Sequence, residues 1–507
     1  MVNSITRMSQ AFVMLLVLGI SYALPSSGIQ PFNPVFGIVN TGPVPINPVA
    51  VQPNPVTVQP TPVADQATPV AVQPNPVTVQ PTPVADQATP VSGHANPVSS
   101  QANRPEAQVN NSLTRATQVL GRHITDFGLE MSDAILQNGE QDTVVFSPLS
   151  IATLLMLLMA GMGKQSKTYY ETAELLGYNS NGNDEHLHQL YKQLLNDLSS
   201  KNDRISLKIG NQLFLQGDSN NSVQVLSSFT KTAKENYNAG IETLNFFSDP
   251  FGSTNRINEW VNTATEGKIP KLLSNPLNPH TKFMAVNTVY FKAPWESPFL
   301  TDATRMKSFD TGRGKIDMKF MTQIMDVKYH DLIVSDTLNA TIIELPYKGT
   351  RYSMFIMKPK GPASLNSVIQ LEEALTANNL NILLEATKSK QPQPVSVQIP
   401  RMRLKYRTSL KDTLKKMGAT SMFSAINADF SRITSSNQPI MDDMIHEAVM
   451  DITEEGTEAV AASSTLGWKF GTNLVFELDQ PSLLCIHDSK TKVPIFWVRL
   501  VTPENIL

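Results

Sequence analysis

Apolar residues follow two spacings along the chain, and these predict both helices and strands. Helical spacing, with apolar residues three and four positions apart, runs through 126–137, 151–162 and 185–198. Short alternating or apolar runs predict strands over 205–214, 282–291, 341–345, 352–358, 395–403, 475–478, 482–486 and 495–501. Because helices come mostly first and strands mostly later, the pattern predicts an α+β fold with large, largely antiparallel sheets.

The N-terminal quarter follows neither spacing. Residues 48–103 form eight heptads that each begin Pro-Val, and the 21-residue block 48–68 is repeated without change at 69–89. Proline in every repeat removes a backbone donor and clashes within a helix, so this heptad period is not that of a coiled coil. The Pro/Val/Gln composition predicts a disordered, extended arm. Repeat expansion without a role, a spacer, a glycosylated arm and a docking segment are all compatible with it.

The first residues have the features of a secretory signal. Arg7 supplies a positive charge, 11–20 an apolar run, and the sequence SYA at 21–23 a cleavage site. The run is too short for a membrane-spanning helix, which needs roughly 20 residues. We therefore expect a secreted, extracellular protein without membrane association. Its parts are a signal peptide (1–23), a disordered extension (24–110) and a globular domain (111–507).

Charge and cysteine content narrow the possible functions. The formal net charge is −3 and the chain has no long basic run, so nothing indicates nucleic-acid binding. The single cysteine, Cys485, excludes an intramolecular disulfide, and its apolar neighbours predict a buried, inert thiol. Sequons begin at Asn110, Asn220 and Asn339, which are the candidate glycosylation sites.

Motifs of catalysis and metal binding are missing from the sequence. It has no G-x-S-x-G, H-E-x-x-H, Walker A or dinucleotide-binding pattern. His186 and His188 are two residues apart and would point to different faces of a helix, so they form a poor metal pair and are expected on a solvated surface. We expect a protein that is not an enzyme and that holds no metal or cofactor.

The segment 454–472, EEGTEAVAASSTLGWKFGT, carries the strongest functional signal. It begins with charge and a glycine, continues with six small residues at 459–464 and then becomes bulky. Small, weakly polar side chains can be exposed in one state and buried in a sheet in another at modest cost, whereas large or charged ones cannot. The pattern is typical of a loop that is cut and then inserted into a sheet.

From residue 112 to 507 the chain resembles the serpin family through six ordered motifs. These are FSPLSI (146–151), NEWVNTATEGKI (258–269), NTVYFKAPWESPF (287–299), LPYKG (345–349), IHEAVMDITEEGTEA (445–459) and PIFWVRLVTP (494–503). The resemblance implies three β-sheets, about nine helices and an exposed reactive-centre loop at about 454–475. With its signal peptide and N-terminal extension, the chain is similar to the secreted inhibitory serpins of arthropod haemolymph.

The resemblance also implies a mechanism and a set of residues. A serine protease cleaves the loop, and the hinge of the loop inserts as a new strand before the acyl-enzyme is hydrolysed. The hinge residues are Glu454, Glu455, Gly456, Thr457, Glu458, Ala459, Val460, Ala461 and Ala462. The polar cluster beneath the central sheet (the shutter) matches Ser147, Ser150, Asn287 and His446, and the point where insertion begins (the breach) matches Trp295 and Glu454. Taken alone, the serines could be helix caps and His446 a core histidine.

Two bonds are candidates for cleavage. Lys469–Phe470 suits a trypsin-like protease, whose pocket places an aspartate under the cation, and Phe470–Gly471 suits a chymotrypsin-like one. The Lys-Phe-Gly sequence resembles the activation site of insect prophenoloxidase, which implies an inhibitor that restrains a melanisation or immune cascade. A non-inhibitory serpin and a matrix-associated protein are the alternatives.

Two positions depart from the family pattern, and one cofactor is not indicated. Trp497 stands where serpins usually have glycine, which would alter local packing, and Ser463 stands where the hinge usually has threonine. The segment 184–197 contains one lysine, Lys192, and no arginine, so no heparin-type site is evident. We expect a monomer whose partner is a chymotrypsin-fold protease.

Overall fold

The computed structural model describes residues 104–139 (for 104–114 the backbone alone), 142–178, 184–199, 205–217, 223–334, 338–434, 439–454 and 474–505. Nine α-helices lie within these residues: α2 (Arg104–Gln137), α3 (Pro148–Gly161), α4 (Lys167–Leu175), α5 (Glu185–Leu198), α6 (Ser227–Tyr237), α7 (Pro250–Ala264), α8 (Leu365–Glu373), α9 (Ala377–Lys388) and α10 (Lys411–Lys416). The strands are β1 (Val144–Phe146), β2 (Ser206–Gln216), β3 (Gly240–Leu244), β4 (Phe283–Lys292), β5 (Leu300–Asp310), β6 (Lys315–Ile333), β7 (Asn339–Pro346), β8 (Tyr352–Pro359), β9 (Gln393–Pro400), β10 (Met402–Ser409), β11 (Asp443–Ile452), β12 (Val475–Glu477), β13 (Ser482–Asp488), β14 (Pro494–Leu500) and β15 (Glu504–Asn505).

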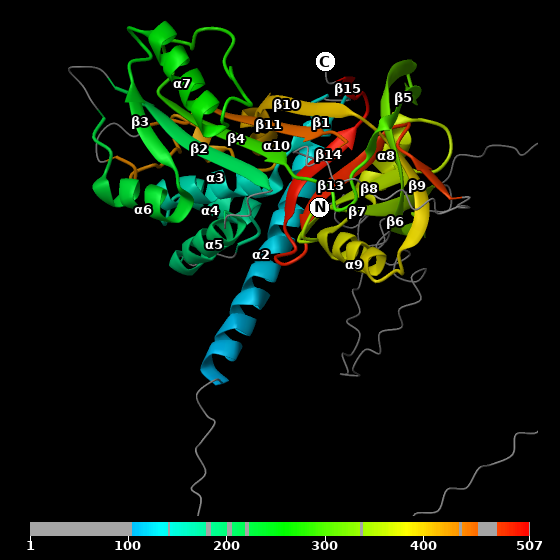
Figure 1. The fold of residues 1–507 in the computed structure, drawn as a ribbon. Helices are drawn as coiled ribbons and strands as arrows, with labels where there is room; N and C mark the ends of the chain where they lie inside the picture. Colours follow the sequence, from blue (N-terminus) through cyan, green and yellow to red (C-terminus); the bar gives the residue numbers. More distant parts are fainter. Residues whose placement is uncertain are drawn as a thin grey trace, which may run out of the picture. The chain divides into compact units, whose positions relative to one another are not determined.

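Pairing joins the described strands into a six-stranded and a nine-stranded sheet, and the nine-stranded one divides at the long strand β6 into two, which makes three sheets (Figure 1). One sheet has six strands in the order β15-β10-β11-β4-β2-β3. Strand β6 pairs with β5 and with β9 through its first part, and with β7 through residues 328–333. This division yields the sheet β5-β6-β9-β12 and the sheet β6-β7-β8-β13-β14-β1. The α+β architecture with three sheets is therefore confirmed.

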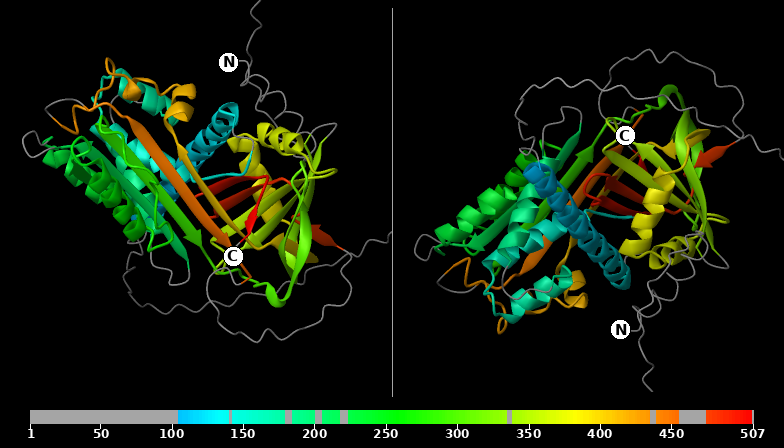
Figure 2. Two further views of the ribbon diagram at one scale, coloured as in Figure 1. Left: turned by 90° about the horizontal axis from the view of Figure 1, so that it is seen from above. Right: turned by 90° about the horizontal axis from the view of Figure 1, so that it is seen from below.

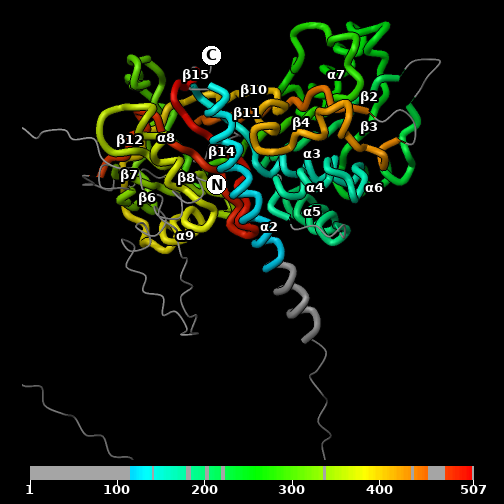
Figure 3. The backbone as a smooth tube through the Cα atoms, turned by 180° about the vertical axis from the view of Figure 1, so that it is seen from behind, coloured from blue at the N-terminus to red at the C-terminus, as the bar shows by residue number. Residues whose placement is uncertain are grey.

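Helix α3 forms the centre of the main core. All fourteen of its residues are buried, because it is apolar on every side and therefore has no face suited to water. It contacts β4 of the six-stranded sheet and β14 of another sheet. The longer helix α2 contacts α3, α9, α10 and β14 (Figure 3).

Helix α2 begins at Arg104, so it includes residues 104–110, which were predicted from the sequence to belong to the extension. No helix in the described part of the chain has the length and apolarity needed to cross a membrane.

Helix α7 packs against the six-stranded sheet, over β2, and forms a second, smaller core there. The close approach depends on Gly210, since a Cβ atom at that position would lie 2.8 Å from Thr288 Oγ1 and 3.2 Å from the Trp260 ring. No helix was predicted over 250–264 from the sequence. The start signals are nevertheless present, because Pro250 occupies the first turn and the Asp249 side chain accepts a hydrogen bond from Gly252 N.

The predicted strand over 395–403 is wrong as a single element. Strand β9 ends at Pro400 and β10 begins at Met402 in another sheet, and Arg401 N donates to Lys319 O between them. The buried positions change phase at this junction, from odd-numbered residues up to Ile399 to even-numbered residues from Met402. The change of phase marks the chain's passage from one sheet to the next.

Candidate functional site

Strands β4 and β11 lie side by side at the centre of the six-stranded sheet (Figure 2). They are parallel, with eight paired positions from Met284↔Asp443 to Phe291↔Met450. Their outer neighbours, β2 and β10, pair with them in antiparallel fashion. Strand β11 ends at Ile452, directly before the segment in which the sequence analysis placed the reactive loop. A strand returning from that loop between β4 and β11 would run antiparallel to both.

One face of this pair carries a completely buried polar network, which we call the back-face network: Ser147, Ser150, Asn211, Asn287 and His446. Asn287 and His446 are directly opposite one another across the two strands. Asn287 Nδ2 lies 2.6 Å from Ser150 Oγ, 3.2 Å from Ser150 O and 2.6 Å from Asn211 Oδ1. The structure thus brings together the four shutter residues named from the sequence.

His446 completes the network in a single tautomer. Its Nδ1 lies 2.5 Å from Asn287 Oδ1, and its Nε2 lies 3.3 Å from Ser147 N. Because a backbone N–H can only donate, Nε2 accepts and Nδ1 carries the proton. Burial lowers the pKa of His446 to about 3, so the imidazole is neutral.

Ser147 has both of the functions that the sequence left open. Its side chain accepts from Ser150 N at 3.1 Å and caps α3, while its own N–H bonds to His446. Sequence reasoning missed Asn211, which faces Asn287 across β2 and β4. The sequence did contain a clue to Asn211: its amide side chain lies in the apolar second half of a predicted strand, where a buried polar group needs a hydrogen-bond partner.

The opposite face of the same two strands carries buried polar groups that make no hydrogen bond within the described part of the chain. Glu447 and Thr288, the paired residues next along from His446 and Asn287, are fully buried. Neither carboxylate oxygen of Glu447 nor Thr288 Oγ1 makes a hydrogen bond to any described residue. Lys405 Nζ forms an ion pair with Glu447 at 3.1 Å. Burial outweighs this pair and raises the pKa of Glu447. We call Glu447 and Thr288 the front-face pair.

Trp295 is buried beside the end of β11. Its indole Nε1 donates to Thr453 O at 2.9 Å, which attaches it to the residue after the strand. Its ring stacks on Tyr347 with a centroid distance of 4.4 Å and an interplanar angle of 11°, and Phe299 packs against it edge-on at 6.0 Å. The ring thus anchors the last part of β11 to neighbouring segments.

Glu454, the last described residue before the loop, is also fixed by contacts. Its Oε1 accepts from Thr304 Oγ1 at 2.9 Å, its Oε2 lies 3.5 Å from Arg401 Nε, and its carbonyl accepts from Phe299 N at 2.8 Å. These contacts join the end of β11 to β5 and to the β9–β10 junction. Trp295 and Glu454 therefore meet at one end of the β4–β11 pair, as the breach assignment requires.

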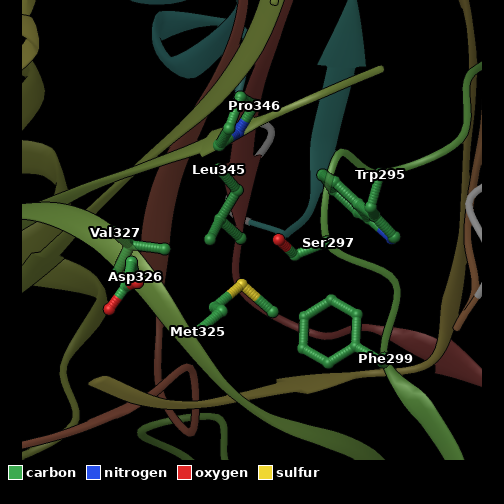
Figure 4. Close-up of a pocket in the computed structure, with 8 residues that line it drawn as sticks. All are labelled: Trp295, Ser297, Phe299, Met325, Asp326, Val327, Leu345 and Pro346. Atoms are coloured by element: carbon green, nitrogen blue, oxygen red, sulfur yellow. The ribbon is translucent and has the colours of Figure 1, made fainter. Parts of the chain in front are cut away.

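A small cavity lies beside Trp295 (Figure 4). It is lined by Trp295, Ser297, Phe299, Met325, Asp326, Val327, Leu345 and Pro346. Its volume of about 20 Å³ accommodates no more than a water molecule. The packing is thus slightly open beside Trp295, between the segment 295–299 and strands β6 and β7.

The remaining predicted residues have different outcomes. Hinge residues 455–462, Ser463 and the two candidate bonds at 469–471 lie outside the described residues, as do the side chain of Asn110 and all of Asn220. Asn339 is exposed at the start of β7. Cys485 is buried, as predicted, and burial raises the pKa of its thiol to about 12, which disfavours the reactive thiolate.

Trp497 does alter local packing. It is buried, and its indole donates to Glu372 of α8 at 2.7 Å. Glu372 also forms an ion pair with Arg499 at 2.8 Å, so the helix is joined to β14 by a buried polar cluster.

The surface prediction is wrong for His188. His186 is exposed, but His188 is buried, with a ring nitrogen hydrogen-bonded to Tyr237 Oη and Asp184 within 3.4 Å. The partner on α6 is distant in sequence, which is why local spacing could not show it. Among the described side chains, no cluster of three or more His, Cys, Asp or Glu could hold a metal ion.

Comparison with known proteins agrees with this geometry. The family model described as "Serpin (serine protease inhibitor)" matches residues 122–503. A serine protease inhibitor of Mus musculus is 30% identical over 389 residues, covering 75% of this chain and 83% of that protein. Leukocyte elastase inhibitor of Xenopus tropicalis is 29% identical over 384 residues, covering 75% of this chain and 98% of that protein.

Solved structures agree as well. Human glycosylated kallistatin has a TM-score of 0.68 and 25% identity, covering 77% of this chain and 100% of its own. Uncleaved ovalbumin has a TM-score of 0.66 and 23% identity, covering 76% and 100%, and thus shares the fold. The two relatives compared by sequence are vertebrate proteins, so the resemblance to arthropod haemolymph proteins stays a prediction.

Proposed function

The chain belongs to the serpin family, and from this premise we propose that it is a secreted inhibitor that traps a trypsin-like serine protease as a covalent acyl-enzyme. Its reactive loop binds the protease as a substrate would, and Lys469–Phe470 is the bond that the protease cuts. Phe470–Gly471 is the alternative bond and would direct the same trap to a chymotrypsin-like protease.

The observation that carries the proposal is the closed, parallel β4–β11 pair, whose second strand leads into the loop. Inserting a strand between them replaces one parallel ladder with two antiparallel ladders, which are slightly more stable per residue. A net gain of about eight main-chain hydrogen bonds, at about 1 kcal/mol each, makes the inserted state more stable by on the order of 10 kcal/mol. The uncut protein is thus held away from its most stable arrangement.

The chemistry requires only the protease's own catalytic groups. The protease serine Oγ attacks the carbonyl carbon of Lys469, and the bond from that carbon to the Phe470 nitrogen breaks. The Phe470 amine leaves with a proton from the protease histidine, and Lys469 becomes an ester of the serine. Insertion of the hinge then competes with hydrolysis of this ester. The trap succeeds when insertion is faster.

The composition of the hinge supports an inhibitor over a non-inhibitory serpin. Residues 459–464 contain no proline, charge or large side chain that would block entry into a sheet. Some solved structures with this fold bear other functions in their names, such as thyroxine-binding globulin in complex with thyroxine. That example keeps a binding function as the second candidate. The signal-like N-terminus supports secretion, and the Lys-Phe-Gly sequence supports a role in a melanisation or immune cascade.

Brief mixing with trypsin, and separately with chymotrypsin, tests the proposal on an SDS gel and by mass spectrometry. We expect an SDS-stable adduct with trypsin and a released peptide that begins at Phe470. A peptide that begins at Gly471 would shift the target to chymotrypsin-like enzymes. Thr457→Arg should convert the chain into a substrate that is cut without forming an adduct, whereas the matched control Thr457→Ser should still trap. Cleavage of the wild type without an adduct by either enzyme would overturn the inhibitory function.

A further inference from the structure

The sheet β5-β6-β9-β12 exposes an apolar patch next to the end of the loop. Ile324 of β6 and Val475 of β12 both pair with Ser396 of β9, so the three side chains lie in one row on one face. Ile324 is 47% exposed and Val475 is 56% exposed, and Leu474 beside it is 39% exposed. We call Ile324, Leu474 and Val475 the sheet-edge patch.

The surroundings of this patch resemble those of a protein interface. Asp326 is exposed on one side, and Lys307, Gln398 and Glu477 form a polar cluster on the other, with Lys307 paired to Glu477 and bonded to Gln398. An apolar centre with a polar rim is typical of surfaces that bind another protein. Strand β12 is also the last described strand of its sheet (Figure 3). Edges of this kind usually carry lysine or proline, which prevent unwanted pairing, whereas this one begins with Leu474 and Val475.

The position of the patch in the chain identifies its occupant. Val475 is the fifth residue after Phe470, and a fully extended chain over five residue steps spans at most about 17 Å. A protease domain of about 225 residues has a radius of gyration of about 17 Å. A protease–inhibitor interface of standard size covers about 800 Å² on each partner, which corresponds to a disc of about 16 Å radius. A protease that holds the Lys469–Phe470 bond is therefore large enough to reach the sheet-edge patch.

We propose that the sheet-edge patch is a second contact site for the target protease, which binds an apolar area on the enzyme outside its active-site cleft. The proposal rests on the proposed function, because the loop must first be the segment that the protease engages. Contact at the patch adds affinity to the encounter complex before the bond is cut. It selects among trypsin-like proteases that would all accept Lys469, because their surfaces differ outside the cleft.

The test compares two variants on one strand. Ile324→Ser removes the apolar side chain that β6 contributes to the patch. Because Ile324 lies outside the reactive loop, the bond that the protease cuts is unchanged. Ile333→Ser is the matched control, since Ile333 is 51% exposed at the C-terminal end of β6, about 30 Å along the strand from Ile324. For each full-length chain, the second-order rate of trypsin trapping, the number of inhibitor molecules consumed per trapped enzyme and the unfolding temperature are measured.

We expect Ile324→Ser to lower the trapping rate about fivefold, and Ile324→Ser combined with Val475→Ser about tenfold or more. The consumption ratio and the unfolding temperature should equal those of the wild type, and Ile333→Ser should trap at the wild-type rate. Equal rates for wild type and both patch variants would overturn the second contact site while leaving the inhibitory function intact. A wild-type chain that forms no adduct would instead overturn the proposed function itself.

Discussion

The two faces of the β4–β11 pair are built in opposite ways. On the back face, Asn287 and His446 join an extensive hydrogen-bonded network. One residue further along the same strands, Thr288 and Glu447 are equally buried but find no hydrogen-bond partner within the described chain. Since adjacent residues of a strand point to opposite faces, these contrasting environments are separated only by the thickness of the sheet.

The difference suggests how a sheet can be stable enough to fold and still able to open. The back-face network holds β4 against β11, since separating them breaks several buried hydrogen bonds at once. The front-face pair has the opposite effect. The buried Glu447 carboxylate, despite its ion pair with Lys405, and the Thr288 hydroxyl make no hydrogen bond to any described residue, so each destabilises the closed state. Removing groups from one face should therefore loosen the closed pair, and removing groups from the other should tighten it.

The largest effect is expected on the back face. Asn287→Ala should lower the free energy of unfolding by about 3–5 kcal/mol, because Ser150 Oγ, Asn211 Oδ1 and His446 Nδ1 each lose their hydrogen bond to Asn287 in a buried site. Urea unfolding at pH 7 measures the change. Asn196→Ala, at an exposed position of α5, is the matched control and should change stability by less than about 0.5 kcal/mol. Equal effects of the two substitutions would show that the network does not hold the strands.

His446 should make the stability depend on pH. Its pKa is lowered to about 3 in the folded protein, against 6.5 ordinarily, so the unfolded chain takes up a proton first as the pH falls. The stabilisation is complete above pH 6.5 and is lost between pH 6.5 and about 3, at about 1.4 kcal/mol per pH unit. Urea unfolding between pH 6.5 and 5 should show a shallower slope for His446→Gln than for the wild type. Parallel slopes would contradict a buried neutral imidazole.

Glu447→Gln on the front face should have the opposite sign. The pKa of Glu447 is raised, so its ionised form destabilises the folded protein at neutral pH, and this penalty disappears as the pH falls below its ordinary value of 4.5. The variant should be more stable than the wild type by about 1–2 kcal/mol at pH 7, and the difference should shrink as the pH falls through the raised pKa and be gone below pH 4.5. It should also trap protease more slowly, because the closed pair is tighter. A destabilised Glu447→Gln at pH 7 would show that the Lys405 ion pair outweighs burial.

Thr288→Val should have the smallest effect. It replaces a hydroxyl that is hydrogen-bonded to none of the described residues with a methyl group of similar shape, which should stabilise the folded protein by about 1 kcal/mol. Unlike Glu447→Gln, it removes no ionisable group, so the gain in stability should be the same at pH 5 and pH 8. Thermal unfolding at both pH values distinguishes the two substitutions, and a loss of stability would mean that the hydroxyl is satisfied in solution.

The sequence was sufficient for the fold class and for four of the five residues of the back-face network. Ordered motifs placed Ser147, Ser150, Asn287 and His446 together, and spacing alone predicted the bounds of α5. The front-face pair was missed because β11 is buried on both faces along nearly its whole length. Without an alternation of buried and exposed positions, the sequence did not show that Glu447 lies on the other face from His446.

Other features depend on partners that are distant in sequence. His188 is buried by Tyr237 of α6, and Asn211 is significant only because Asn287 lies opposite it in the next strand. At the junction of β9 and β10 the chain passes from one sheet to another. The only local trace of this change is that the buried positions switch from odd-numbered to even-numbered residues. Local spacing predicts elements, whereas these contacts arise from how the elements pack.

Cutting the loop tests directly whether the closed β4–β11 pair opens for a new strand. The unfolding temperature of the intact chain is compared with that of chain cut within 459–466 by thermolysin. Insertion of about eight residues should raise the unfolding temperature by roughly 20 °C, since about 10 kcal/mol is gained and each kcal/mol shifts a large domain by about 2 °C. An unchanged or lowered unfolding temperature after cleavage would contradict insertion and, with it, the trap.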